Sequence, residues 1–277
     1  MRAVFISIFI LLTYAVRAQE LFVVTEPASN VPAGSVGIKL GESLMKEQYK
    51  EGYNYHMMPE ITWGVDKNLM LRVSGFISNR NSTSSELKTE GGSLYAKYRF
   101  LSTDDLHSHF RMAAFGRYSF NNADIHQEEI ETMGHNSGFE FGMVATQLIQ
   151  KVAISSSVSV EKALDNKPDY PFPDTQSDVA FNYTLSVGKL MYPKRYSDYK
   201  QTNINFMLEF MGQTLTENQR SFLDIVPSVQ FILNSQARID LAYKQELYSS
   251  MLRSAPNGFY LNLQYTFFSL RGNQKND

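Results

Sequence analysis

The chain has no cysteine among its 277 residues. Without thiols it has no disulfide framework, no thiolate metal site and no cysteine for lipid attachment. It also lacks an excess of either charge, because 26 basic side chains stand against 28 acidic ones. A nucleic-acid-binding protein needs a clustered basic excess, so we exclude nucleic acid as a partner.

Long apolar runs are absent except at the N-terminus. There Arg2 precedes an apolar stretch over residues 3 to 16, and the small residue Ala18 follows. This stretch is too short to span a bilayer as a helix, which needs roughly 20 residues. We therefore interpret residues 1–18 as a signal peptide cleaved before Gln19, rather than as an anchor. Cleavage removes two arginines and no acid, so the mature chain has a net charge of −4.

The rest of the chain contains no apolar run near eighteen residues, which excludes a helical membrane protein. Its length fits one large β domain or two smaller domains, and no Pro/Gly/Ser-rich linker divides it. We assign residues 19–33 to a periplasmic N-terminal segment, 34–269 to a β-barrel and 270–277 to a polar C-terminal tail.

Alternation of apolar and polar residues is the main feature that is present. The last example is the clearest, with apolar side chains at Phe259, Leu261, Leu263, Tyr265 and Phe267 and polar ones at Asn262, Gln264 and Thr266. Helical spacing would mix these two classes, so period two indicates β-strands. Stretches of about ten alternating residues separated by polar breaks are typical of transmembrane β-strands.

This pattern predicts an all-β fold, a transmembrane antiparallel barrel of twelve strands. The expected strands are 34–45, 52–64, 68–79, 91–101, 108–121, 137–149, 151–162, 177–190, 200–214, 221–233, 237–249 and 257–269. Short breaks alternate with mostly longer ones, as in barrels with periplasmic turns and long outer loops. We expect both termini in the periplasm of a Gram-negative bacterium.

Aromatic residues make up 13% of the chain and gather near the ends of the expected strands, for example at Tyr53, Trp63, Tyr98 and Phe267. They fit the two interfacial girdles of a membrane barrel. A secreted soluble barrel would also be rich in aromatics. The apolar outward faces favour the membrane barrel, because a soluble barrel would place its polar residues outside.

Residues 58–68 read Met-Pro-Glu-Ile-Thr-Trp-Gly-Val-Asp-Lys-Asn, a proline-led alternating strand followed by a turn. A related pattern starts at Pro227, and a proline within a paired strand marks a bulge or a local break. The segment at Pro59 resembles that of the outer-membrane proteins grouped with the meta-pathway of phenol degradation. The resemblance covers about twenty residues and implies passage of small, often apolar molecules across the outer membrane.

The predicted inward faces carry many charges. We propose as lumen selectivity residues the basic Arg72, Lys97, Arg99, Arg111 and Arg117, and opposite them the acidic Glu140, Glu209, Asp224, Asp240 and Glu246. Two opposed arcs of charge form a constriction that orients a dipolar solute and sets ion preference. The alternative is a network of inward salt bridges that fills the barrel, as in eight-stranded barrels.

No pattern indicates an enzyme. None of the five histidines lies in a nucleophile elbow or a zinc-protease motif. His56 and His109 fall on predicted inward faces, where a lipase triad with a serine is conceivable. Acidic residues and histidines crowd 124–135 without the spacing of a calcium loop, so we expect a solvated outer loop there.

The sequence therefore predicts a narrow outer-membrane channel for small solutes, without cofactor, metal or catalytic residues. Two alternatives remain: a non-conducting barrel whose surface loops adhere to a partner, and an outer-membrane lipase. The expected partners are outer-membrane lipid, lipopolysaccharide, small solutes and the barrel-assembly machinery. A lumen filled by residues 19–33 would favour the non-conducting barrel, and a histidine within reach of a lipid-facing wall serine would favour the lipase.

Overall fold

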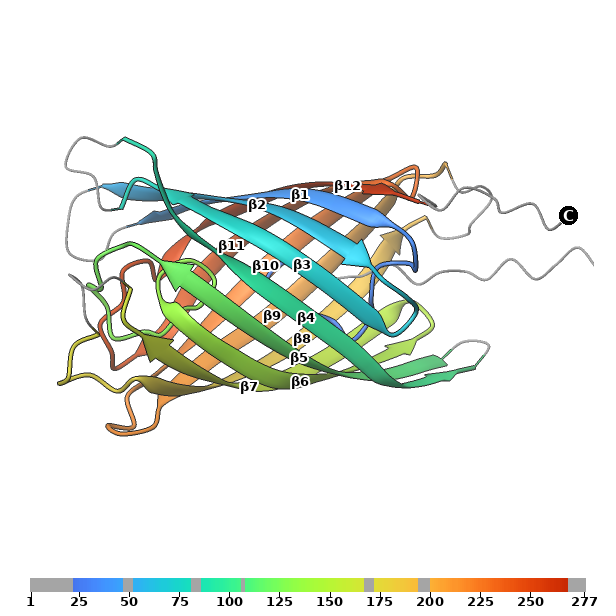
Figure 1. Ribbon diagram of the computed structural model, residues 1–277. Helices are drawn as coiled ribbons and strands as arrows, with labels where there is room; N and C mark the ends of the chain where they lie inside the picture. The colour runs from blue at the N-terminus through green and yellow to red at the C-terminus, as the bar shows by residue number, and fades with distance from the viewer. Residues whose placement is uncertain are drawn as a thin grey trace, which may run out of the picture.

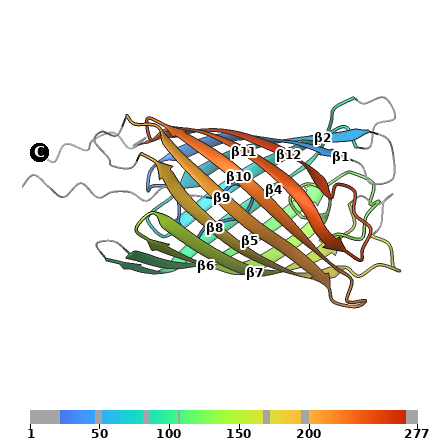
Figure 2. The same cartoon turned by 180° about the vertical axis from the view of Figure 1, so that it is seen from behind.

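A computed structural model describes residues 22–46, 52–80, 86–105, 108–166, 172–193 and 200–268. The predicted signal peptide and C-terminal tail lie outside these residues. The described chain forms one closed antiparallel barrel in which each strand pairs with its sequence neighbours and β1 pairs with β12 (Figures 1 and 2). The twelve strands are β1 (Val36–Lys46), β2 (Tyr53–Gly64), β3 (Leu69–Ser78), β4 (Lys88–Asp104), β5 (Ser108–Asn121), β6 (Ser137–Ile149), β7 (Val152–Leu164), β8 (Val179–Tyr192), β9 (Asn203–Leu215), β10 (Ser221–Leu233), β11 (Ala237–Ser249) and β12 (Asn257–Phe267).

The predicted fold class and strand number are confirmed, and every strand end falls within three residues of the predicted one. The largest difference is β4, which extends beyond the predicted 91–101 at both ends. Its pairing with β5 continues to Asp104 opposite His109, with a bulge between Arg99 and Leu101. The bulge shifts the alternation, and this shift hid the continuation of the strand from a period-two pattern.

The outward face of the barrel is apolar and the inward face is polar, as predicted. Large apolar side chains such as Ile61, Phe141 and Phe259 are more than half exposed on the outside. Of the aromatics expected in the girdles, Tyr55 is half-buried, and the others are exposed: Tyr53, Trp63, Tyr98, Phe100, Tyr118, Phe120, Phe267 and Phe268. Buried side chains are largely polar or charged, including Glu60, Lys97, Glu209 and Asp240. This inverted arrangement is that of a barrel surrounded by lipid.

Pro59 of β2 and Pro227 of β10 each interrupt a strand ladder, as predicted. On the β2–β3 side, pairing passes from Met57 opposite Ile77 to Glu60 opposite Ser74, so Pro59 is unpaired there. On the β10–β11 side, Pro227 lies in the corresponding gap. Neither gap shifts the register, because proline removes a donor without adding a residue.

The connections differ at the two ends of the barrel. The short-turn end carries the connections around residues 65–68, 105–107, 150–151, 193–202 and 234–236, and there β1 begins and β12 ends. The long-loop end carries the connections around 47–52, 79–87, 122–136, 165–178, 216–220 and 250–256. Among the described residues, no helix is long and apolar enough to cross a membrane.

Candidate functional site

All ten predicted selectivity residues lie on the inner face of the barrel. Contacts with residues inside the barrel show this placement. Arg72 and Lys97 contact Glu26, and Arg111 contacts Ser29. Asp224 and Glu246 both contact Arg253. Glu140, Glu209 and Asp240 are buried within the barrel, and Arg99 donates to the backbone of the 65–68 turn. Their orientation follows from strand alternation, whereas their role in selectivity stays a prediction.

Some charges on the inner face pair with a charge of opposite sign on the neighbouring strand. Arg117 pairs with Glu140 across adjacent strands, with Nη1 3.3 Å from Oε2. Glu60, which the predicted arcs omit, lies on the basic side and binds Lys39 at 2.8 Å. These pairs are consistent with the salt-bridge alternative, because an unpaired buried charge is costly. Both the opposed arcs and the salt-bridge network stay predictions.

Residues 22–33, called here the N-terminal segment, lie inside the barrel rather than outside it in the periplasm. The backbone N–H of Ala28 donates to Thr146 Oγ1 at 2.9 Å, on β6. The hydroxyl of Thr25 lies 2.7 Å from that of Ser186, on β8. Val23 packs against apolar residues of β9, β10 and β11. Contacts with strands all around the barrel show that this segment crosses the lumen.

Glu26 joins the N-terminal segment to the basic side of the wall. Its carboxylate binds Arg72 Nη1 and lies 3.2 Å from Lys97 Nζ. The ammonium of Lys97 is fully buried and also donates to the carbonyls of Pro27 and Ser29, at 2.8 and 2.9 Å. Burial alone would raise the pKa of Glu26, but Arg72 and Lys97 together hold it well below its ordinary value.

Glu209 holds the other side of the same segment. Its carboxylate, fully buried on β9, accepts the backbone N–H groups of Val23 at 3.0 Å and Thr25 at 2.7 Å. The N–H of Val24 lies 3.2 Å from the same carboxylate. Several N–H donors converging on one carboxylate stabilise the charged form. Glu209 therefore fixes the backbone of the segment, while Arg72 and Lys97 fix its acidic side chain.

A glycine in the wall lets the segment approach the barrel closely. A Cβ placed on Gly64 would lie 2.2 Å from the carbonyl oxygen of Pro32, which is far inside van der Waals contact. The N–H of Gly64 donates to Ser35, and its carbonyl accepts the N–H of Gly34. Any side chain at position 64 would push the segment away from the end of β2.

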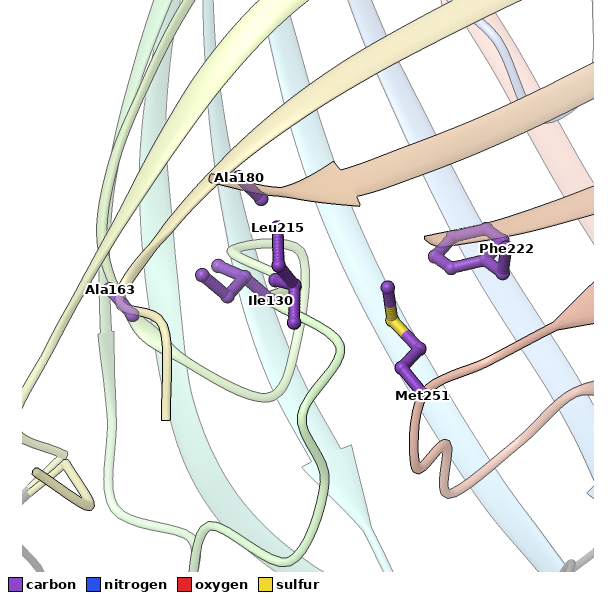
Figure 3. Close-up of a cluster of buried hydrophobic side chains, with 6 residues drawn as sticks. All are labelled: Ile130, Ala163, Ala180, Leu215, Phe222 and Met251. Atoms are coloured by element: carbon purple, nitrogen blue, oxygen red, sulfur yellow. The ribbon is translucent and has the colours of Figure 1, made fainter. Parts of the chain in front are cut away.

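Residues 122–136, called here the inserted loop, fold into the long-loop end of the lumen. Ile130 exchanges two hydrogen bonds with the side chain of Gln213, and Thr132 donates to Glu161 from both its N–H and its hydroxyl. Ile130 also packs into a buried apolar cluster with Leu215, Phe222 and Met251 (Figure 3). The prediction of a solvated loop is wrong here, because the loop carries apolar side chains that need cover.

Arg253, from the 250–256 loop, fastens the inserted loop to the wall. Its guanidinium is fully buried and binds Glu129 of the inserted loop, at 2.9 and 3.0 Å, and Asp224 of β10, at 2.7 Å to each oxygen. It also pairs with Glu246 and lies 3.6 Å from the ring centre of Phe222. Bidentate carboxylate pairs and ring stacking are what arginine, unlike lysine, can combine.

None of the histidines that the structure describes is hydrogen-bonded to a serine of the lipid-facing wall. His109 pairs with Asp104 at 2.8 Å. His135 Nε2 lies 3.4 Å from Ser254 Oγ, and its Nδ1 binds Glu131, but the Ser254 hydroxyl donates to Gln127. This serine lies on a loop that closes the lumen and not on a lipid-facing wall. The described residues also contain no cluster of three or more His, Asp or Glu that could hold a metal ion.

Sequence reasoning missed Glu26, Glu60 and Arg253. Glu60 could have been found, because it continues the inward, even-numbered set of its strand beside Thr62. Glu26 and Arg253 lie in segments without period-two alternation. Their contacts with strand residues far away in the sequence leave no local signal.

Comparison with known proteins gives structural matches only. No protein family and no curated protein matches this sequence. An outer membrane channel from Pseudomonas putida F1 superposes with a TM-score of 0.57 at 12% identity, over 88% of this chain and 99% of that one. The KdgM porin superposes with a TM-score of 0.50 at 9% identity, over 83% and 99% respectively. The fold is therefore that of outer-membrane porins and channels.

Proposed function

We propose that the protein is a narrow outer-membrane channel for small solutes, closed in this structure by the N-terminal segment and the inserted loop. The observation that carries the proposal is the way the lumen is filled. An eight-stranded barrel is filled by its own wall side chains, whereas twelve strands enclose a wider space. Here a separate piece of chain occupies that space, and the contacts found between it and the wall are non-covalent.

The orientation and partners follow from this proposal. A barrel of this kind has its short turns and both termini in the periplasm and its long loops outside the cell. Its outer surface would contact outer-membrane lipid and lipopolysaccharide, and the barrel-assembly machinery would insert it. The resemblance of residues 58–68 to the meta-pathway group supports the same class of function.

The non-conducting barrel is the second candidate, and the same filling favours it. If the N-terminal segment never leaves the lumen, the long loops at the other end would be the functional surface. The two proposals differ in one property, because a channel needs a segment that moves and a plug needs one that does not.

A cross-link can test this difference, because the chain has no native cysteine. Ala28 of the segment packs against Val144 of β6 in a buried cluster. We expect the Ala28→Cys, Val144→Cys double variant, once joined by oxidation to a disulfide or by a short cross-linker that forms disulfides with both thiols, to block solute entry into proteoliposomes. Reduction should restore entry.

Each single-cysteine variant, treated with the same reagents, is the matched control and should conduct throughout. Equal entry in the joined and reduced states would show that the segment does not gate the lumen. No entry in any state, including the reduced one, would establish the non-conducting barrel.

A further inference from the structure

The N-terminal segment occupies a two-ended polar site in the lumen. At one end, its Glu26 carboxylate lies between Arg72 and Lys97. At the other end, its backbone N–H groups converge on Glu209. The segment thus presents to the wall a carboxylate and a set of N–H donors, separated by one to three residues.

Lys97 depends on the segment for its partners. Among the described residues, its ammonium has three acceptors, and all of them belong to the segment: the carboxylate of Glu26 and the carbonyls of Pro27 and Ser29. Lys97 is fully buried, and among the described residues Arg72 beside it keeps the carboxylate of Glu60, at 3.9 Å, and the hydroxyl of Thr62, at 3.2 Å, once Glu26 leaves. An open lumen would therefore expose a cationic pair that needs an anion.

Glu209 depends on the segment for hydrogen-bond donors, as Lys97 depends on it for acceptors. Apart from donors of the segment, its carboxylate has only the hydroxyl of Ser228, at 3.4 Å, within the part of the chain that the structure describes. No ion pair found there involves Glu209. Withdrawal of the segment would leave a buried carboxylate that needs N–H or ammonium donors.

We propose that Arg72, Lys97 and Glu209 form a binding site for acidic amino acids and short acidic peptides, which the segment occupies in the closed barrel. A solute with two carboxylates and an ammonium group replaces both sets of contacts at once: its carboxylates take the places of the Glu26 carboxylate and of the two carbonyls on Lys97, and its ammonium takes the place of the N–H groups on Glu209. Three residues along the chain separate Val23 from Glu26. The donor end and the carboxylate end of the segment therefore lie within about 10 Å of each other, which is the span of a dipeptide or tripeptide. This inference rests on the proposed channel function and names its solute class.

Competition between solute and segment gives a test that does not depend on conductance. Ala28 is fully buried, so the thiol of an Ala28→Cys variant should react slowly with a maleimide in the folded, lipid-inserted protein. A tethered segment acts at an effective concentration in the millimolar range, so the solute must be supplied well above it. The probes are L-glutamate and the isosteric L-glutamine at equal ionic strength, balanced with sodium chloride.

We expect glutamate to raise the labelling rate about threefold or more over glutamine, because only glutamate supplies a second carboxylate for the cationic pair. Adding Lys97→Met should raise the basal rate and remove the preference for glutamate. Lys244→Met is the matched control and should keep the preference, because within the described chain this buried lysine of β11 makes no hydrogen bond or ion pair with the segment.

Equal labelling with both probes would overturn the carboxylate site. A glutamate effect that survives Lys97→Met would place the site elsewhere and overturn the assignment of these residues. The outcome is separable from the channel proposal: if glutamate releases the segment while no variant conducts, the binding site stands and the channel does not.

Discussion

At the scale of single residues, burial in this barrel means the opposite of burial in a soluble protein. Lys97 and Arg253 are among the largest fully buried side chains, while Phe141 and Phe259 are well exposed. The charged groups tolerate burial because each is surrounded by oxygen acceptors: one carboxylate and two carbonyls around Lys97, three carboxylates around Arg253. Removing a partner is therefore expected to cost more than removing an exposed ion pair.

The depth of a residue in the membrane gives a first prediction. Leu241 and Leu247 both lie on the outward face of β11 and are about half exposed, but Leu247 is near the long-loop end. Leu241→Arg should destabilise the barrel by roughly 2 to 4 kcal/mol and Leu247→Arg by roughly 0 to 1 kcal/mol. The free energy of unfolding in lipid vesicles measures both. Equal costs would mean that β11 is placed wrongly relative to the bilayer.

The Arg253 cluster gives a second prediction. Arg253→Met leaves Asp224 and Glu129 without their shared cation and should destabilise the folded barrel by about 3 to 5 kcal/mol. Arg220, whose exposed guanidinium pairs with Glu128, is the control, and Arg220→Met should leave the stability nearly unchanged. Denaturant unfolding compares them, and protease cleavage within 122–136 should increase only for Arg253→Met. No difference between the two variants would contradict the clamping role of Arg253.

At the scale of elements, the strands could be predicted and the lumen contents could not. A strand that faces lipid on one side and polar groups on the other must alternate apolar and polar residues. For this reason β9 and β12 can be recognised from the sequence alone. The N-terminal segment and the inserted loop have no such constraint. Their positions depend on Glu209, Lys97 and Arg253, which are distant from them in the sequence and contact them in the folded barrel.

The binding of the N-terminal segment in the lumen should weaken as pH falls into the acid range. Because the pKa of Glu26 lies well below its ordinary 4.5 in the seated segment, its contribution is present above that ordinary value and is lost as pH falls through the lowered one. Labelling of Ala28→Cys should therefore stay slow from neutral pH to about pH 5 and increase only in stronger acid. An exposed thiol in Asn218→Cys corrects for the reagent's own pH dependence.

Two outcomes would count against this account of Glu26. Release of the segment between pH 7 and pH 5 would mean that its carboxylate is not held by the two cations, since only a carboxyl with an ordinary or raised pKa titrates near there. Identical pH profiles for Glu26→Gln and the native segment would show that another group controls the release.

At the scale of the whole molecule, the barrel has an apolar outer surface between two ends that differ in the length of their connections. The short turns, the start of β1 and the end of β12 lie at one end of the barrel, and the inserted loop closes the other end. Alternation of short and long breaks predicted this division from the sequence. Which end faces the cell exterior is a property of the inserted protein, so it is a prediction.

Cysteine labelling tests the orientation cleanly. Asn218 is exposed at the long-loop end and Lys67 is exposed at the short-turn end. In intact cells, an impermeant maleimide should label Asn218→Cys and leave Lys67→Cys unmodified until the outer membrane is permeabilised. Labelling of Lys67→Cys alone in intact cells would reverse the barrel and exclude long outer loops at the cell surface.

Single-channel recording in planar bilayers tests the central claim, a channel closed by its own N-terminal segment, most directly. The wild-type barrel should give rare, small current steps. Glu26→Gln should open far more often with a similar step size, because it weakens the hold on the segment without altering the wall. Correctly folded wild-type and Glu26→Gln barrels that both stay silent would contradict the claim, and the filled lumen would then be a permanent plug.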